Sequence, residues 1–178
     1  MISMIKLIKM AEKLDRNFFE RSPKAVAKDL IGKVLVHRLE NGEELAGMIQ
    51  ETAAYSKPMK AMTKNYEGMC QEAGRIHMFD YRGSKFLNIS TISGEPSVVH
   101  IYKLFPIRGN ICKRKNPYKF TNGPGKLTKA FKIEHGYNGA SIYRGNLWIE
   151  DQGLKSGVKE VKDKKLAAIC LGHYQLSN

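Results

Sequence analysis

A glycine-rich turn leading into a lysine, Gly123-Pro124-Gly125-Lys126-Leu127, is one segment of this chain whose residue types and spacing could do chemistry. Such a turn at the start of a helix exposes backbone N–H groups and the positive end of the helix dipole, which suit a phosphate. It is not the phosphate loop of a nucleotide-binding protein, because that loop needs a longer glycine spacing and a serine or threonine after its lysine. A plain turn followed by a helix is the alternative interpretation.

Basic residues gather just before this turn, and we expect the segment from Arg108 to Lys119 to begin as a helix. These side chains could line a track of phosphates, with a solvated surface as the alternative. The candidates are Arg108, Lys113, Arg114, Lys115 and Lys126. The whole chain has 30 Lys and Arg against 17 Asp and Glu, a net charge of +13. That imbalance favours a polyanionic partner such as nucleic acid, the ribosome or an anionic membrane.

A second segment of interest is the run Gly47-Met48-Ile49-Gln50-Glu51-Thr52-Ala53-Ala54-Tyr55. It forms the end of a predicted strand, where alternation places Glu51 and Ala53 on the same face. Tyr55, at the end of this strand, could be a half-buried core residue.

The elements around these segments predict an α+β domain. Ser22 caps a helix that starts at Pro23 and ends at Gly32. Asn41-Gly42 is a strong hairpin turn between predicted strands at Val34–Leu39 and Leu45–Thr52. Further strands are predicted at Arg75–Phe79, Phe86–Ser90, Ser97–Leu104 and Leu147–Glu150, with a helix at Lys126–Ile133 and a loop at Lys57–Ala73. Many short strands with segregated helices are typical of the α+β class.

Length and composition predict one domain in a reducing compartment. We expect residues 1–13 to form a basic helix or arm and residues 14–178 the domain. The three cysteines, Cys70, Cys112 and Cys170, lack a Cys-x-x-Cys spacing, so neither a disulfide framework nor a zinc site is expected. The N-terminal run is broken by lysines and does not read as a signal peptide. No apolar run approaches the roughly 20 residues of a membrane helix, so we expect no membrane and an intracellular location, in the cytoplasm, nucleoid or nucleus.

Taken together, these segments resemble the alkyladenine (3-methyladenine) DNA glycosylase family. The family's active-site strand reads Ile-x-Glu-Thr-Glu-Ala-Tyr, and this chain keeps Ile49, Glu51, Thr52, Ala54 and Tyr55. Other similar segments follow in the family's order: Asp15-x-x-Phe18-Phe19, Ala27-x-x-Leu30-Ile31-Gly32-Lys33-Val34-Leu35-Val36, Asn41-Gly42, Leu45-x-Gly47, Gly83, Asn88-Ile89-Ser90, the Gly123–Leu127 turn and Leu147-Trp148-Ile149-Glu150. The resemblance spans residues 14–152, and the family's closing Pro-Arg-Ile-Gly and Pro-Trp-Arg-Phe elements are not found.

The resemblance implies a fold and a chemistry. The fold is a single α+β domain with a curved antiparallel sheet and peripheral helices. The chemistry is base-excision repair, in which an alkylated or deaminated purine is rotated out of duplex DNA and its N-glycosyl bond is hydrolysed. The family needs no metal and no organic cofactor, and we expect a monomer that acts on duplex DNA.

Site residues carry over from the family only in part. Tyr55 matches its first stacking tyrosine, and Asn88 matches an asparagine that senses the purine edge. The tyrosine that wedges into the DNA falls at Tyr81 or Arg82, because the alignment shifts by one residue around Gly83. The remaining positions hold other residue types: the family's histidine falls near Lys64, with Tyr66 close by, and its water-positioning arginine falls near Tyr102 or Lys103.

The main departure is Ala53, which stands where the family has the glutamate that activates water. Glu51 could take over as the base, but two residues along a strand span about 6–7 Å. Glu67 and Asp80 are other candidates. The competing hypothesis is a non-catalytic module that binds DNA or RNA with the same fold, and a weaker one is a protein directed to RNA or the ribosome.

Overall fold

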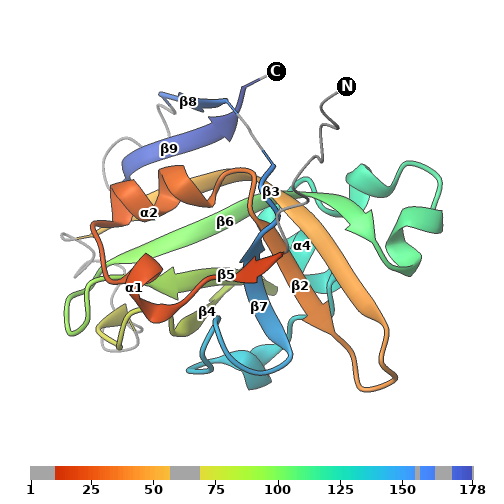
Figure 1. Cartoon of the computed structure of the whole chain (residues 1–178), viewed down its shortest axis with the longest axis horizontal. Coiled ribbons are helices and arrows are strands. Elements are labelled where there is room, and N and C mark those ends of the chain that lie inside the picture. Colours follow the sequence, from red (N-terminus) through yellow and green to blue (C-terminus); the bar gives the residue numbers. More distant parts are fainter. Residues whose placement is uncertain (1–10, 57–68, 155–156, 163–169, 178) are drawn as a thin grey trace, which may run out of the picture.

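A computed structural model of the chain describes residues 11–56, 69–154, 157–162 and 170–177. Within these ranges an antiparallel sheet of nine strands forms the body of the molecule, with short helices around it (Figure 1). The strand order is β1-β7-β2-β3-β6-β5-β4, and two more strands join because β9 pairs with β3 and β8 pairs with β9. The predicted α+β class is confirmed.

The elements have the following bounds. The strands are β1 (Glu12–Lys13), β2 (Val34–Arg38), β3 (Glu44–Tyr55), β4 (Ile76–Tyr81), β5 (Ser84–Ser90), β6 (Val98–Arg108), β7 (Leu147–Asp151), β8 (Val158–Glu160) and β9 (Cys170–Leu176). The α-helices are α1 (Arg16–Phe19), α2 (Pro23–Leu30) and α4 (Pro124–Ala130), and the 3₁₀ helices are η2 (Asn110–Lys113), η3 (Pro117–Phe120) and η4 (His135–Tyr137).

Strand β3 joins the parts of the sheet because it has three partners. Its first half pairs with β2, and its second half, from Glu51 to Tyr55, pairs with β9. Strand β6 pairs with β3 along the other edge, from Ala46 to Tyr55. The register shifts on both sides of Glu51, and such irregularities bend a strand and redirect its side chains. The strand was predicted to end at Thr52, whereas β3 continues to Tyr55.

Helix α2 defines one face of the sheet. It begins as predicted, with Ser22 Oγ accepting a hydrogen bond from the Ala25 N–H at 3.3 Å and Pro23 in the first turn. The helix packs against β3, β6 and β9 (Figure 1). Thr52 Oγ1 donates to the Ala27 carbonyl at 2.7 Å, so Thr52 faces α2. Because side chains alternate along a strand, the neighbours of Thr52 on β3 face away from α2.

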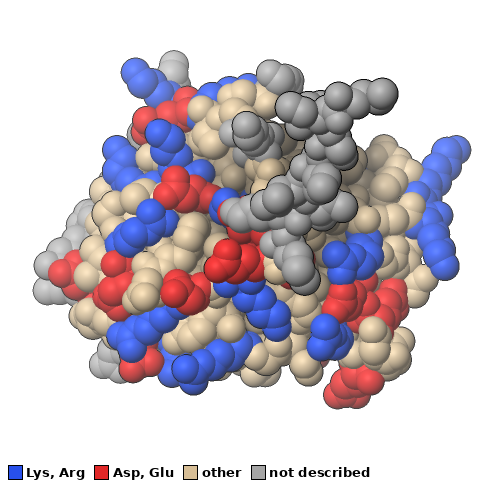
Figure 2. Space-filling model, viewed as in Figure 1, with Lys and Arg blue, Asp and Glu red and all other residues tan. Residues whose placement is uncertain are grey.

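The face that carries α1 and α2 is not a uniformly basic surface. Figure 2 shows Lys and Arg side chains interleaved with Asp and Glu over this face. Two of the contacts are ion pairs, Arg16 with Glu20 at 3.4 Å and Arg21 with Asp29 at 2.9 Å. Such exposed pairs contribute little to stability, but they leave this face without a strong positive field.

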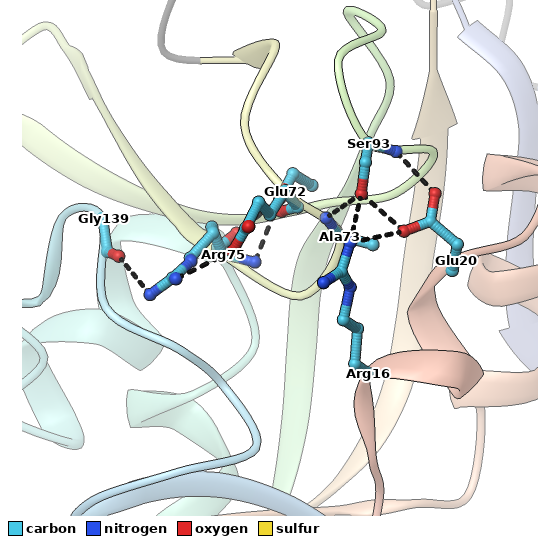
Figure 3. A network of polar contacts seen from close by, with 8 residues as sticks. Arg16, Glu20, Glu72, Ala73, Arg75, Ser93 and Gly139 are labelled. Atoms are coloured by element: carbon cyan, nitrogen blue, oxygen red, sulfur yellow. Dashed lines mark hydrogen bonds and ion pairs between the residues drawn. The ribbon is translucent and has the colours of Figure 1, made fainter.

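A polar network connects α1 to the start of β4 (Figure 3). Ser93, in the turn between β5 and β6, accepts a hydrogen bond from the Ala73 N–H at 3.0 Å. The Ser93 backbone N–H donates to Glu20 at 2.7 Å, and the Ser93 hydroxyl also donates to Glu20. These hydrogen bonds from Ser93 lower the pKa of Glu20 below its ordinary value. The network fixes the chain just before β4 and so helps to place the β4–β5 hairpin.

Two local features differ from expectation. The helix expected to start at Arg108 is wrong: Arg108 ends β6, and two short 3₁₀ helices follow. Gly109 (φ 102°) and Asn116 (φ 54°) have positive φ values, which a continuous right-handed helix does not allow. Strand β9 was not expected at all. Of the predicted basic helix or arm, Glu12–Lys13 forms strand β1, and residues 1–10 lie outside the described residues.

Candidate active site

One row of side chains crosses five strands on the face of the sheet turned away from α2. It runs from His77 on β4 through Asn88 on β5, His100 on β6 and Ala53 on β3 to His173 on β9, each the direct cross-strand partner of the next. All five residues are buried. Two histidines therefore flank residue 53, whose own side chain is a single methyl group.

His100 is held in one protonation state by Asn88. The Asn88 amide nitrogen donates to the His77 carbonyl at 3.2 Å, which leaves its oxygen Oδ1 as the acceptor for His100 Nδ1 at 2.7 Å. Nδ1 of His100 therefore carries the proton, and Nε2 presents a lone pair. Burial, together with the nearby His173, lowers the pKa of His100 to about 3. The ring is thus neutral at physiological pH.

Glu51 is a buried carboxylate with a partner on each oxygen. Oε1 accepts from His173 Nε2 at 2.7 Å, and Oε2 forms an ion pair with Lys103. Burial raises the pKa of Glu51, but the hydrogen bonds and charges of His173 and Lys103 outweigh that effect, and the pKa lies below its ordinary value. Glu51 is therefore ionised at neutral pH, and each of its carboxylate oxygens already has a partner.

His173 takes its tautomer from this contact. An ionised carboxylate only accepts hydrogen bonds, so Nε2 of His173 carries the proton that faces Glu51. When the ring is neutral, Nδ1 presents a lone pair, and it is buried without a hydrogen-bond partner among the described residues. The same holds for Nε2 of His100. The two residues beside Ala53 thus each keep one unsatisfied nitrogen acceptor.

Tyr102 lies near Ala53, whose side chain is short. It packs against a small apolar cluster that contains Ala53 and Tyr55. Its ring centroid lies 4.3 Å from that of His100 and 5.4 Å from that of His173. Its hydroxyl is 2.8 Å from the hydroxyl of Tyr55. The two tyrosines and the two histidines therefore form one continuous aromatic surface around Ala53.

Further rings extend this surface to the tip of the β4–β5 hairpin. His100 contacts Phe86 with ring centroids 5.3 Å apart, and Phe86 contacts Tyr81 at 5.8 Å. Tyr81 is the last residue of β4 and 46% exposed. The turn after it consists of Arg82 and Gly83, both at positive φ (49° and 76°), as a type I′ hairpin requires. Positive φ is uncommon for arginine and marks a constrained turn.

The Gly123–Leu127 turn holds helix α4 against this hairpin. A Cβ added at Gly125 would lie 2.7 Å from Ser84 Cβ, and Thr128 Oγ1 donates to the Lys85 carbonyl at 2.7 Å. Lys126 is exposed and donates to Asn122 Oδ1 at 3.2 Å. The seven-residue helix α4 begins at Pro124, two residues before the predicted start at Lys126. Its close packing against the hairpin explains why residue 125 is a glycine.

The predicted basic residues lie in one acid-free part of the chain. Between Glu95 and Glu134 there are nine Lys and Arg and no Asp or Glu. Lys113 and Lys115 are exposed, whereas Arg114 stacks on Phe120 at 4.7 Å. Arg108 forms an ion pair with Glu44. Helix η2 contacts η3, and η3 contacts α4, so these elements form one contiguous region that also carries Lys126.

The predicted site residues separate into two groups. The structure brings together Glu51, Ala53, Tyr55, Asn88, Tyr102 and Lys103 around the row, and Tyr81 and Arg82 at the hairpin. Asp80 lies elsewhere: it is exposed and 3.9 Å from His135. Lys64, Tyr66 and Glu67 lie outside the described residues. His77, His100 and His173 were missed, and a signal for them, a histidine in the apolar end of a strand, was present only in Val98-Val99-His100-Ile101.

Three further findings describe the part of the chain that the structure covers. Among the described residues, no group of three or more His, Cys, Asp or Glu is arranged to hold a metal ion. The described helices are all too short or too polar to cross a membrane. All three cysteines are thiols.

Comparison with known proteins gives the family. The model of the family described as Methylpurine-DNA glycosylase (MPG) matches residues 17–168, and the chain belongs to this family. A protein of Prosthecochloris aestuarii is 34% identical over 150 residues, covering 76% of this chain and 72% of the relative. One of Natranaerobius thermophilus is 35% identical over 147 residues, covering 73% and 74%. One of Listeria monocytogenes is 34% identical over 150 residues, covering 75% and 72%. Each is named "Putative 3-methyladenine DNA glycosylase".

Proposed function

We propose that this protein is a base-excision repair enzyme that removes alkylated or deaminated purines from duplex DNA by hydrolysing the N-glycosyl bond. It acts as a monomer inside the cell and uses no metal or organic cofactor. The observation that carries the proposal is the continuous aromatic surface from Tyr81 to the buried row at Ala53. Membership of the Methylpurine-DNA glycosylase family supports the class of reaction.

Tyr81 is the residue we propose as the wedge. A damaged base must leave the stack to be reached, and proteins that open a duplex insert a ring or an apolar side chain into the gap. Tyr81 is exposed at the tip of a hairpin, whereas Arg82 lies in the turn with its guanidinium 5.2 Å from the Tyr81 ring. The aromatic residue has the flat surface that replaces a base in the stack, and Arg82 adds positive charge beside it.

The rotated purine would lie against Tyr55 and Tyr102. An alkylated purine carries a positive charge, and the faces of aromatic rings attract cations by about 0.5–2 kcal/mol. The ring of Tyr102 is held by the hydroxyl contact with Tyr55 and by packing against His100. Rings fixed in this way lose little entropy on binding a flat base, and the cation–π attraction favours a cationic base over a neutral one.

The direct test is excision from a defined duplex. Oligonucleotides with one 3-methyladenine or one hypoxanthine are incubated with excess protein, and abasic sites are counted by alkaline cleavage. We expect abasic sites at the lesion and none in the undamaged duplex. Tyr81→Ala should slow excision at least tenfold, and Tyr118→Ala, another partly exposed tyrosine, should not. Absence of excision from both lesions would contradict the proposal.

One observation favours a second candidate, a non-catalytic module that recognises lesions. Residue 53 has no carboxylate, and Tyr102 packs against the cluster that contains it. Such a module would bind the lesion duplex more tightly than undamaged duplex without making abasic sites. Fluorescence anisotropy with both duplexes, and competition by structured RNA, separates this candidate from the enzyme and from an RNA-binding protein.

A further inference from the structure

We propose that His173, oriented by Glu51, activates the water nucleophile in place of the carboxylate that the family carries at residue 53. This inference rests on the proposed glycosylase function and names the group that makes hydrolysis possible in this chain. In this arrangement His173 is a catalytic residue and Glu51 is a positioning residue.

Position supports His173 first. Its backbone is paired directly with that of Ala53 in the β3–β9 ladder, and directly opposed residues of antiparallel strands have Cα atoms about 4.5–5.5 Å apart. A side chain from His173 therefore reaches the space beside residue 53 without any change in the backbone. The functional group has moved to the neighbouring strand, but it stays in the same row of the sheet.

Protonation supports His173 next. In the neutral ring of His173, the hydrogen bond to Glu51 Oε1 at 2.7 Å holds the proton on Nε2, which leaves the lone pair of Nδ1 as the available acceptor. A carboxylate that fixes the tautomer of a histidine base and stabilises the imidazolium that forms is the arrangement found in catalytic triads. Glu51 cannot be the base itself, because Lys103 and His173 occupy its two oxygens.

The unsatisfied nitrogens point to a ligand. A buried acceptor without a hydrogen bond costs about 1–3 kcal/mol, and native proteins rarely leave such groups unpaired. Among the residues that the structure describes, neither Nδ1 of His173 nor Nε2 of His100 has a partner, and these two histidines flank Ala53 from opposite sides. A water molecule over Ala53 has two protons to donate and two acceptors to receive them. We assign the positioning of that water to His100 and its deprotonation to His173.

The reaction balances with these groups alone. The water oxygen forms a bond to C1′ of the damaged nucleotide while one of its protons passes to His173 Nδ1. The bond between C1′ and the purine nitrogen breaks, and its electron pair leaves with the purine. A cationic 3-methyladenine nucleotide thus yields neutral 3-methyladenine and an abasic sugar, and the proton on His173 is released to solvent.

The described residues near His173 include other titratable groups that bear on the pH dependence of the reaction. These groups are Glu51 and Tyr55 on β3, His100, Tyr102 and Lys103 on β6, and Cys170 on β9. Glu51 titrates below the ordinary carboxylate range and His100 near pH 3. Model tyrosine, lysine and cysteine side chains titrate above about pH 8. A general base works only while it is unprotonated, so the proposal predicts a rate of excision that falls on acidification.

The experiment measures single-turnover excision of 3-methyladenine from duplex DNA between pH 5.5 and 8.5, with lesion binding measured alongside. The wild-type rate should fall with decreasing pH across this range. His173→Gln should lower the rate about 100-fold, within the 10²–10⁴ range of general-base assistance, and remove the pH dependence while lesion binding persists. Glu51→Gln should lower the rate less. His37→Gln is the matched control: His37 is also a buried histidine, but unlike His173 it has a hydrogen-bond partner on each ring nitrogen.

The possible outcomes separate the two proposals. Wild-type excision that is independent of pH, or that His173→Gln leaves unchanged, overturns the role of His173 and leaves the glycosylase function standing. Excision by Ala53→Glu but not by wild type also overturns it, because residue 53 would then be vacant without replacement. No excision by wild type, His173→Gln or Ala53→Glu contradicts the proposed function itself. If His173→Gln does not fold, the pH dependence of the wild-type rate and the excision rate of Glu51→Gln still test the role of His173.

Discussion

At the scale of single residues, Ala53 and Tyr102 form one packing unit. Tyr102 lies on the cluster that contains Ala53 and touches both flanking histidines. A glutamate at residue 53 would compete with this ring for space. Overpacking a well-filled site costs about 1–3 kcal/mol, so we expect Ala53→Glu to lower the free energy of unfolding by about that amount, measured by urea denaturation.

A double-mutant cycle tests this coupling. Tyr102→Ala alone removes ring contacts, but in the Ala53→Glu background it makes room, so the two changes together should cost at least 1 kcal/mol less than their sum. Additive effects would show that Tyr102 and residue 53 do not share space.

Sequence reasoning found one side of this site and missed the other. Glu51, Asn88 and Tyr102 were predicted because they match positions of a family pattern. His100 and His173 carry no such match, and their role depends on strand register, which brings residues 47 and 120 positions away next to Ala53. Long-range pairing of this kind leaves no local signal in the chain.

At the scale of elements, the Gly123–Leu127 turn offers a matched pair of glycines. A Cβ at Gly125 would lie 2.7 Å from Ser84 Cβ and 3.6 Å from Phe86, whereas a Cβ at Gly123 meets only the flexible Lys126 side chain at 3.8 Å. Gly123 has extended backbone (φ −179°) that any residue can adopt. The first glycine is therefore replaceable and the second is not.

We therefore expect Gly125→Ala to destabilise the protein by about 1–3 kcal/mol and Gly123→Ala to be within about 0.5 kcal/mol of wild type. Urea unfolding of both variants measures this difference. Because Gly125 sets the distance between α4 and the β4–β5 hairpin, its variant should also slow excision. Equal stability of the two variants would contradict this reading of the turn.

The elements themselves were predictable where local chemistry decides them. The Ser22 cap, the Asn41-Gly42 turn and the hairpin partners around it all appear close to the expected positions. The basic segment was wrongly expected to start a helix because Lys and Arg favour helices, whereas Gly109, Asn116 and Pro117 break it. Strand β9 was missed because it follows the last segment that resembles the family, and only its pairing with β3 gives it a place.

At the scale of the whole molecule, buried neutral histidines make the fold sensitive to acid. Burial lowers the pKa of His37, His77 and His100, the last to about 3. The unfolded chain binds protons on these rings near pH 6.5 while the folded chain does not, so stability is complete above about pH 6.5 and falls below it. The lowered pKa values of Glu20, Glu44 and Glu51 act only below about pH 4.5.

His100 alone should cost about 2 kcal/mol between pH 6.5 and pH 5, at 1.36 kcal/mol per pH unit. Urea unfolding at pH 7.5 and pH 5.0 measures the loss, and His100→Gln should reduce it by a similar amount. The exposed His135 is the control, and His135→Gln should leave the loss unchanged. A free energy of unfolding that is equal at the two pH values would contradict the burial of these rings as neutral groups.

The distribution of charge over the molecule decides how it would meet DNA. Acidic and basic side chains are mixed over the α1–α2 face (Figure 2), whereas the stretch between Glu95 and Glu134 has nine basic residues and no acidic one. Lys113 and Lys115 are exposed there, and Lys24 and Lys28 are exposed on α2. Two double variants, Lys113→Gln/Lys115→Gln and Lys24→Gln/Lys28→Gln, therefore change the net charge equally on different surfaces.

Each phosphate contact contributes about 0.9 to the slope of log K against log salt concentration for duplex DNA. Losing Lys113 and Lys115 should therefore flatten the slope by up to about 2 and weaken binding to lesion and undamaged duplex alike, since phosphate contacts carry no sequence information. The α2 variant should keep the wild-type slope, because its lysines lie on the mixed face. Anisotropy titrations from 50 to 200 mM salt measure both slopes. Equal slopes for the two variants would show that binding follows net charge rather than this surface.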